Sequence, residues 1–203
     1  MLTSFGYDPT VCANKLGAFV QSNNLDGVDI DWEDNDAMKK GLGEAWLITF
    51  SQILRSLLPN HIISHAPQAP YFNPNIYPNG GYKAIHDQVG NTIDFYNVQF
   101  YNQGDTTYDT YDSLFIDSGH LNPETAIYQM MARGVEPGKI VLGKPVTEAD
   151  AYNTGFIKGS DLNSLLLEAK KDKRNKGWKP SVMFWHYLSD LDGKNIAAVM
   201  KDV

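Results

Sequence analysis

Three acidic residues alternate with single apolar residues in the stretch 25–34, and they are the first candidates for chemistry. These acids are Asp29, Asp31 and Glu33. A β-strand points successive side chains to opposite faces, so the three are predicted to share one face. Their carboxylates would then follow one another at about 6 to 7 Å, and each would disfavour ionisation of its neighbour. A carboxyl group kept protonated near neutral pH can serve as a general acid, and Glu33, nearest the open end of the strand, is the candidate.

Spacing alone leaves two other interpretations of this row open. Alternation most often marks a half-exposed strand, although acids form strands poorly and like charges in register repel each other. Clustered carboxylates also bind calcium or magnesium. A calcium loop needs glycine at its sixth position, where this chain has Asp34. Acid catalysis is therefore the favoured interpretation, and no metal site is predicted.

Composition sets the limits for the rest of the chain. Its 203 residues are enough for one hydrophobic core and few for two. A net charge of −7 argues against nucleic acid or an anionic membrane as partner, and no apolar run is long enough to cross a membrane. Cys12 is the single cysteine, so an internal disulfide is impossible and the cysteine count gives secretion no support. Met1 leads directly into a strand-like run, so no signal peptide is recognised.

Strand and helix patterns alternate around the acidic row. Besides the acidic strand, strands are expected over residues 1–6, 61–66, 95–101, 139–145 and 181–187. Helices are expected over residues 9–24, 41–58, 122–134, 160–176 and 195–203. This alternation predicts a parallel sheet with crossover helices in a single domain.

Residues 26–33 read Asp-Gly-Val-Asp-Ile-Asp-Trp-Glu and resemble the signature Asp-x-x-Asp-x-Asp-x-Glu of the family 18 glycoside hydrolases, the chitinases and their relatives. The other strands are similar to those of the plant and fungal (class III) chitinases along essentially the whole chain. The resemblance implies an α/β fold, the (β/α)8 TIM barrel, with residues 1–203 as one catalytic barrel domain.

The barrel is expected to be incomplete at its amino end, because about six strands are counted where a closed barrel has eight. Residues 3–6 are similar to the family's third strand, so the chain would supply strands 3 to 8. A fragment of a longer chain is the favoured explanation. The alternatives are a separate segment or another copy that completes the barrel.

The resemblance also implies roles in catalysis. Glu33 would be the general acid and base, and the 2-acetamido oxygen of the substrate would be the nucleophile. Asp31 would orient the acetamido nitrogen, Asp29 would tune the charge of Asp31, and Tyr101 would hydrogen-bond the acetamido carbonyl. No metal or organic cofactor is needed in this scheme.

Further residues are expected to bind the sugar. Gln99 and Asn102 would hold hydroxyls and the acetamido region, and Trp185 would form the floor of the sugar pocket. Ala66 would leave room for the sugar beside Gln68, in a segment similar to the family's Ala-Ala-Pro-Gln. The alternatives from the residues alone are a barrel-filling role for Tyr101 and a core role for Trp185.

Four other features receive no catalytic role. His65 is expected to be buried and neutral, and His186 lies on the face opposite Trp185. Tyr71 and Phe72 would either line outer subsites or pack their loop. The basic run 170–176 is expected to interact favourably with the dipole at the end of its helix and to be solvated.

The expected partner is chitin or a chitooligosaccharide, and family analogy implies secretion. Two rival functions are kept. One is an endo-β-N-acetylglucosaminidase that acts on the N-glycan core, since it would use the same row of acids. The other is a non-catalytic chitin-binding or inhibitor-like barrel, although such relatives generally lack one of the acids that this chain has.

Overall fold

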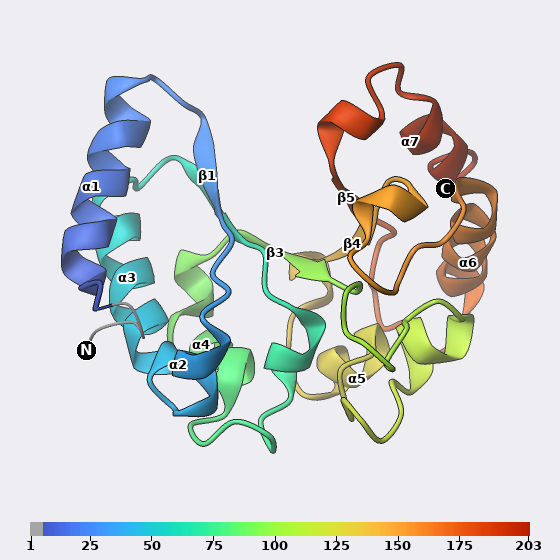
Figure 1. The fold of residues 1–203 in the computed structure, drawn as a ribbon, viewed down its shortest axis with the longest axis horizontal. Helices are drawn as coiled ribbons and strands as arrows, with labels where there is room; N and C mark the ends of the chain where they lie inside the picture. Colours follow the sequence, from blue (N-terminus) through green and yellow to red (C-terminus); the bar gives the residue numbers. More distant parts are fainter. Residues whose placement is uncertain (1–5) are drawn as a thin grey trace. The chain divides into compact units, whose positions relative to one another are not determined.

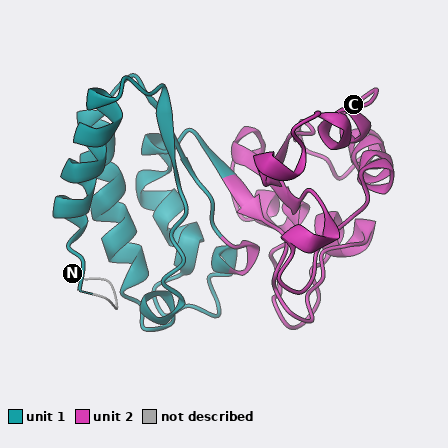
Figure 2. Ribbon diagram, turned by 45° about the horizontal axis from the view of Figure 1, so that its top comes forward, with its two compact units in different colours: residues 1–67, 71–96 teal, residues 68–70, 97–203 magenta. Residues whose placement is uncertain are grey.

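A computed structural model describes residues 6–203, and these form two compact units (Figure 2). Unit 1 takes the described residues up to Pro67 together with Tyr71–Tyr96. Unit 2 takes Gln68–Pro70 and Asn97–Val203. The strand expected over residues 1–6 falls almost wholly outside the described residues.

Unit 1 is built from parallel strands and the helices between them (Figure 1). The strands are hydrogen-bonded in the order β1 (Gly27–Ile30), β2 (Ile62–His65) and the first part of β3 (Phe95–Gln99). The helices are α1 (Pro9–Ser22), α2 (Asn35–Lys39), α3 (Gly43–Leu57) and α4 (Gly81–Val89). Helix α3 packs against both α1 and α4.

Local sequence explains where the first helices of unit 1 begin and what they bury. The Asp8 carboxylate accepts a 2.9 Å hydrogen bond from the Val11 amide, and Pro9 occupies the first helical position, so α1 begins there. Helix α3 buries apolar residues at helical spacing, including Trp46, Phe50 and Leu54. The helices predicted over residues 9–24 and 41–58 are confirmed as α1 and α3, whereas α2 and α4 were not predicted.

Unit 2 repeats the same plan. Its strands are hydrogen-bonded in the order β3, β4 (Ile140–Pro145) and β5 (Val182–Trp185). Its helices are α5 (Ile127–Ala132), α6 (Gly159–Lys171) and α7 (Lys194–Val199), and α6 packs against α7. Among the helices of residues 6–203, none has the length and apolar character that a membrane crossing requires.

The start predicted for α5 is wrong. The cap, proline and acid at residues 122–124 indicated a helix from Asn122, but the helix begins at Ile127. Glu124 has a φ of +64°, which a right-handed helix excludes. The side chain of Gln129 instead reaches back to accept a 3.1 Å bond from the Ala126 amide and closes the first turn.

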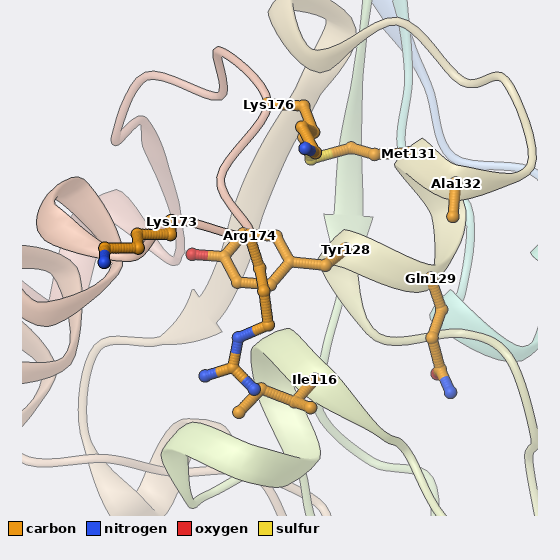
Figure 3. Close-up of a pocket in the computed structure, with 8 residues that line it drawn as sticks. All are labelled: Ile116, Tyr128, Gln129, Met131, Ala132, Lys173, Arg174 and Lys176. Carbon is orange, nitrogen blue, oxygen red and sulfur yellow. The ribbon is translucent and has the colours of Figure 1, made fainter.

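A cavity of about 450 Å³ lies in unit 2 beside α5 (Figure 3). Tyr128 and apolar side chains of α5 share its lining with Arg174 and other cations of the basic run 170–176. The Arg174 guanidinium donates to the Asp172 carboxylate over 2.7 Å. Asp172 follows α6 directly, so this ion pair connects the run to the end of that helix.

Candidate active site

The acidic row follows the carboxyl end of β1 in unit 1. Its alternation is confirmed: Ile30 and Trp32 are 8% and 7% exposed, whereas the acids between and beside them turn outward. Asp29, Asp31 and Glu33 are all exposed. The three carboxylates therefore lie on the side of the chain away from the core of unit 1.

The strand is shorter than the acidic pattern suggested. Its ladder ends at Ile30, so Asp31 and Glu33 follow the strand and do not lie in it. The chain turns because Asp34 caps α2, its carboxylate accepting a 3.0 Å bond from the Ala37 amide. Glu33 therefore sits at a strand-to-helix turn, a common position for functional residues in α/β folds.

Strand β2 supplies the neighbours of the first acid. Ser64 lies opposite Asp29 in the ladder, and its hydroxyl donates a 2.6 Å bond to Asp29 Oδ1. The Ala66 amide donates to the Ile30 carbonyl over 2.9 Å. Ala66, a predicted sugar neighbour, is therefore held where β1 ends and the rest of the row begins.

Aromatic side chains support the row from the core. The centroid of the Trp32 ring lies 6.3 Å from the ring centroid of Trp46 and 6.4 Å from that of Tyr71. Gly43 permits this packing, since a Cβ atom there would come within 2.6 Å of the Trp32 ring. The Tyr71 hydroxyl donates a 2.6 Å bond to Asn35 Oδ1 and so fixes the first residue of α2. Tyr71 is 1% exposed, so of its two predicted roles it packs the loop.

Burial, the neighbouring Tyr77 and the charges of Glu33 and nearby acids raise the pKa of Tyr71. The Tyr71 hydroxyl therefore stays protonated around neutral pH, and its donation to Asn35 persists. Burial likewise raises the pKa of Tyr82, with smaller contributions from other tyrosines and from Asp31 and Asp29. The negative charges of the acids thus contribute to the raised pKa of both buried tyrosines.

His65 is buried completely, and the prediction that it is neutral is confirmed. Its Nδ1 lies 3.1 Å from the Tyr82 hydroxyl and its Nε2 lies 3.4 Å from the Ser51 hydroxyl. Burial lowers the pKa of His65 to about 3. One ring nitrogen then donates and the other accepts, as a neutral imidazole does.

We expect His65 to make the protein less stable as the pH falls. Below a pH of about 6.5 the unfolded chain protonates this histidine, whereas the folded chain does not until the pH reaches about 3. The free energy of unfolding should therefore fall by about 1.4 kcal/mol for each pH unit in this window from His65 alone. Urea unfolding at a series of pH values measures this slope. His65→Leu should flatten it, and an unchanged slope would contradict the assignment.

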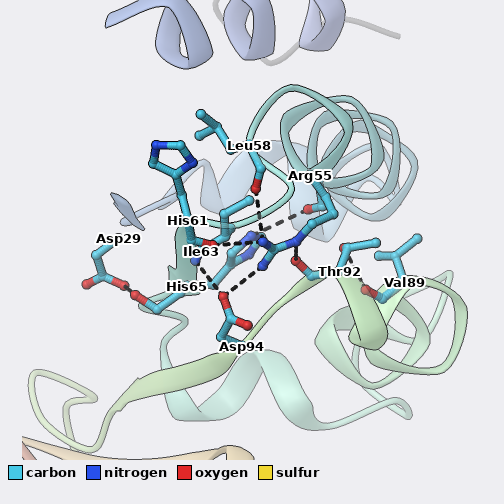
Figure 4. A network of polar contacts seen from close by, with 11 residues as sticks. Asp29, Arg55, Leu58, His61, Ile63, His65, Val89, Thr92 and Asp94 are labelled. Atoms are coloured by element: carbon cyan, nitrogen blue, oxygen red, sulfur yellow. Dashed lines mark hydrogen bonds and ion pairs between the residues drawn. The ribbon is translucent and has the colours of Figure 1, made fainter. Parts of the chain in front are cut away.

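The opposite end of the strands in unit 1 is held by Arg55 (Figure 4). The Arg55 guanidinium donates over 2.7 Å to Asp94, whose carboxylate also accepts a 2.7 Å bond from the Ile63 amide. It further donates to three backbone carbonyls, those of Leu58, His61 and Thr92. These groups precede β2 and β3, so they stabilise the amino ends of the strands, away from the acidic row.

The predicted site residues of unit 2 cluster where β3 ends. Gln99 is the last residue of β3, is 7% exposed and forms an isolated bridge with Gln68. Tyr101 is 4% exposed. Asn102 has a φ of +59°, and its amide donates to the Thr154 carbonyl over 2.8 Å. These four residues thus come together in unit 2.

Trp185 ends β5 and is half exposed, so a core role for this indole is wrong. The peptide bond between Trp185 and His186 is cis. His186 Nε2 lies 3.5 Å from Asp150 Oδ1, which also accepts a 2.6 Å bond from Ser189. His186 therefore has a structural partner, in keeping with the absence of a predicted catalytic role.

The predicted site residues are divided between the units. Asp29, Asp31, Glu33 and Ala66 are brought together along β1 and β2 in unit 1. Unit 2 holds the other five: Gln68, Gln99, Tyr101, Asn102 and Trp185. Across residues 6–203, no three His, Cys, Asp or Glu side chains are grouped so that they could hold a metal ion.

Sequence reasoning missed two residues of unit 2 next to this cluster. Lys144 is completely buried in β4, and the side chain of Tyr152 is 90% exposed on the loop that binds Asn102. The signal for Lys144 was available, since it is the single charged residue in the apolar strand Ile140–Pro145. An exposed tyrosine in a loop has no such signal.

Comparison with known proteins identifies the family and the fold. The family model "Glycosyl hydrolases family 18" matches residues 7–197. A GH18 chitinase from Pseudoalteromonas aurantia has a crystal structure that is 31% identical with a TM-score of 0.78, over 97% of this chain and 68% of that one. The predicted fold class is confirmed: the parallel βα units belong to a partial (β/α)8 barrel.

Two further similarities extend over less of the other protein. "Chitinase 1" of Tulipa saxatilis subsp. bakeri is 28% identical over 88 residues, which are 43% of this chain and 26% of that protein. The chain thus spans about a quarter of this curated relative. A fungal endo-beta-N-acetylglucosaminidase of the same family shares the fold, with 24% identity and a TM-score of 0.65 over 92% of this chain and 58% of that one. Since the family model covers nearly the whole sequence, the chain belongs to glycosyl hydrolase family 18.

Proposed function

We propose that the chain hydrolyses β-1,4-linked N-acetylglucosamine polymers, namely chitin and its oligosaccharides, with retention of configuration. The observation that carries the proposal is the outward-facing row of Asp29, Asp31 and Glu33 at the carboxyl end of a barrel strand. Three exposed acids in a row repel one another without helping the fold, and membership of a glycosyl hydrolase family supports a chemical role for them. By analogy with the family, the proposal includes action outside the cell.

The chemistry uses the substrate as its own nucleophile. Glu33 donates its proton to the glycosidic oxygen as the bond to the anomeric carbon breaks. The 2-acetamido oxygen attacks that carbon from the opposite face and forms an oxazolinium ion. Glu33, now a carboxylate, removes a proton from water, which opens the ring and restores the configuration. No metal ion or organic cofactor takes part in these steps.

The other two acids stabilise the charge that develops on the acetamido group. Asp31 accepts a hydrogen bond from the acetamido nitrogen and stabilises the positive charge of the oxazolinium ion. Asp29 lies behind it and tunes the charge of Asp31, and the 2.6 Å bond from Ser64 holds Asp29 in one orientation.

For unit 2 the proposal assigns sugar binding. Tyr101 donates to the acetamido carbonyl, and Trp185 offers its half-exposed indole to the apolar face of a pyranose. Gln68, Gln99 and Asn102 hold polar groups of the sugar. Asn102 Oδ1 already accepts from the amides of residues 152 and 153, so Asn102 acts on the sugar through its Nδ2 donor. In unit 1, Ala66 leaves space for the ring.

The test is cleavage of N-acetylglucosamine oligomers, with the anomer of the first product read by NMR. We expect the β-anomer to appear first and to convert slowly to the equilibrium mixture, as retention requires. An N-glycan with an intact chitobiose core serves as the comparison substrate. Faster cleavage of that glycan would identify the N-glycan core, and not chitin, as the substrate. An initial α-anomer, or tight binding without cleavage, would contradict the proposal.

A further inference from the structure

Lys144 lies at the centre of the loops that carry Tyr101 and Asn102. Its side chain is completely buried in unit 2. The ammonium group donates three hydrogen bonds to backbone carbonyls, at 2.8 Å to Phe100, 2.6 Å to Tyr108 and 3.0 Å to Gly155. A lysine has three N–H donors, so each of them has one acceptor.

The three carbonyls come from three different segments. Phe100 directly precedes Tyr101 at the end of β3, Tyr108 lies in the loop that follows, and Gly155 lies in the loop after β4. Lysine usually keeps its charge in water, and burial of an ammonium group is costly unless its donors are satisfied. A buried lysine that replaces an apolar residue in a strand therefore points to a purpose other than packing.

The same segments are joined by bonds that fix the predicted binding residues. Asn102 Oδ1 accepts from the Tyr152 amide over 2.7 Å and from the Asn153 amide over 3.2 Å. The backbone of Gly155 lies so close to Tyr101 that a Cβ atom at Gly155 would come within 2.5 Å of the Tyr101 Cα. Each of these contacts needs the loops in the positions that the Lys144 bonds give them.

We propose that Lys144 is a positioning residue that holds Tyr101 and Asn102 in place for the N-acetyl sugar by joining three loops through its ammonium group. The inference rests on the proposed function, since it assigns the two loops to substrate binding. Lys144 is buried beneath the loops, so it acts through Tyr101 and Asn102 and does not touch the substrate itself.

Protonation of Lys144 controls this connection. Burial lowers the pKa of Lys144 to about 7, and the charge of Asp109, next to Tyr108, acts in the opposite direction. Its neighbour across the ladder on β5 is the uncharged Phe184. The neutral amine has two N–H donors, so deprotonation breaks one of the three bonds. The loops are therefore expected to loosen as the pH rises above about 7.

Hydrogen exchange of the loop amides tests the proposal. In the parent protein, exchange at Tyr152 and Asn153, corrected for intrinsic rate, should rise about tenfold from about pH 6 to about pH 8, the effect of losing one bond from a charged donor. Lys144→Met keeps an unbranched side chain that is one atom shorter and removes its donors. This variant should show fast loop exchange with no pH step, and its kcat/KM on N-acetylglucosamine oligomers should fall about tenfold to hundredfold.

Leu142→Ala is the matched control, because Leu142 is equally buried in the same strand and makes no bond to the loops through its side chain. This control loses stability but should keep the pH step in loop exchange. Loops that exchange alike in Lys144→Met and in Leu142→Ala would overturn the role of Lys144. If Lys144→Met does not fold, the parent protein alone still tests the proposal. Loop exchange in the parent that does not change with pH would also overturn the role of Lys144. Failure of the parent to cleave or bind the oligomers would instead overturn the proposed function, so the two failures are read separately.

Discussion

Replacement of Glu33 by glutamine is expected to reduce the rate of chitooligosaccharide cleavage about 10²- to 10⁴-fold, the contribution of a general acid. Glutamine has nearly the shape of glutamate but has no proton to give to the glycosidic oxygen and cannot later accept one from water. Initial rates on N-acetylglucosamine oligomers measure the loss. Calorimetric titration with the same oligomer should show that binding is retained, because the change affects the transition state.

Asp34→Asn provides the matched control for Glu33→Gln. It removes the same charge one residue further along, and asparagine caps a helix as well as aspartate does, so α2 is kept. Its rate should stay within about threefold of the parent. An equal loss in both variants would trace the effect to the net charge of the row. Full activity of Glu33→Gln would contradict its assignment as the acid.

Oligomers without the 2-acetamido group are expected to resist cleavage altogether. An internal nucleophile has an effective concentration of about 10⁵ to 10⁸ M, so its removal should take the rate below detection. Cello-oligosaccharides and fully deacetylated chitosan oligomers of the same length measure this, with products followed by mass spectrometry. Without the acetamido group the substrate has no internal nucleophile. Cleavage would then need a carboxylate nucleophile from the protein, which the substrate-assisted route does not use.

Partly deacetylated oligomers provide the internal control for this prediction. Their two kinds of sugar have the same linkage and nearly the same shape. Cleavage should occur only where the sugar that contributes the anomeric carbon has an acetamido group. Cleavage after a deacetylated sugar would contradict the mechanism and would indicate a carboxylate of the row, such as Asp31, as the nucleophile.

The acidic row could be predicted because its signal is periodic and local. Alternation of acids with Ile30 and Trp32 specifies which side chains turn outward, and the structure has that pattern. The end of the strand could not be predicted in the same way. It depends on the cap that Asp34 gives to α2, a helix of five residues whose sequence has no strong apolar period.

Helices α4 and α5 show where sequence patterns fail. Helix α4 begins at Gly81, the second of two consecutive glycines, and its buried residues include Tyr82 and His86 as well as Ile85. The glycines at its start and the polar groups on its buried face obscure the helical pattern in the sequence, so the helix was not predicted. For α5 the cap pattern at Asn122 was wrong because Glu124 has a positive φ, and Gln129 instead closes the first turn by accepting from the Ala126 amide, which is another local bond.

Lys144 could not be assigned a role from the sequence. Its partners are three backbone carbonyls, and carbonyls have no sequence signature. The prediction of a single domain over residues 1–203 stays a prediction. The roles given to Tyr101 and Trp185 also stay predictions, because they depend on a sugar that only the experiments above can supply.

The bonds of Asp94 also determine which side chain of β2 faces the acidic row. Its backbone amide donates to the Ile63 carbonyl over 2.8 Å, while its carboxylate accepts from the Ile63 amide and from Arg55. β2 is therefore locked against β3 at a single position. A slip by one residue would turn every side chain of β2 to its other face, and Ser64 would point away from Asp29. Arg55 and Asp94, at the far end of the strands, thus fix the register that places Ser64 beside Asp29.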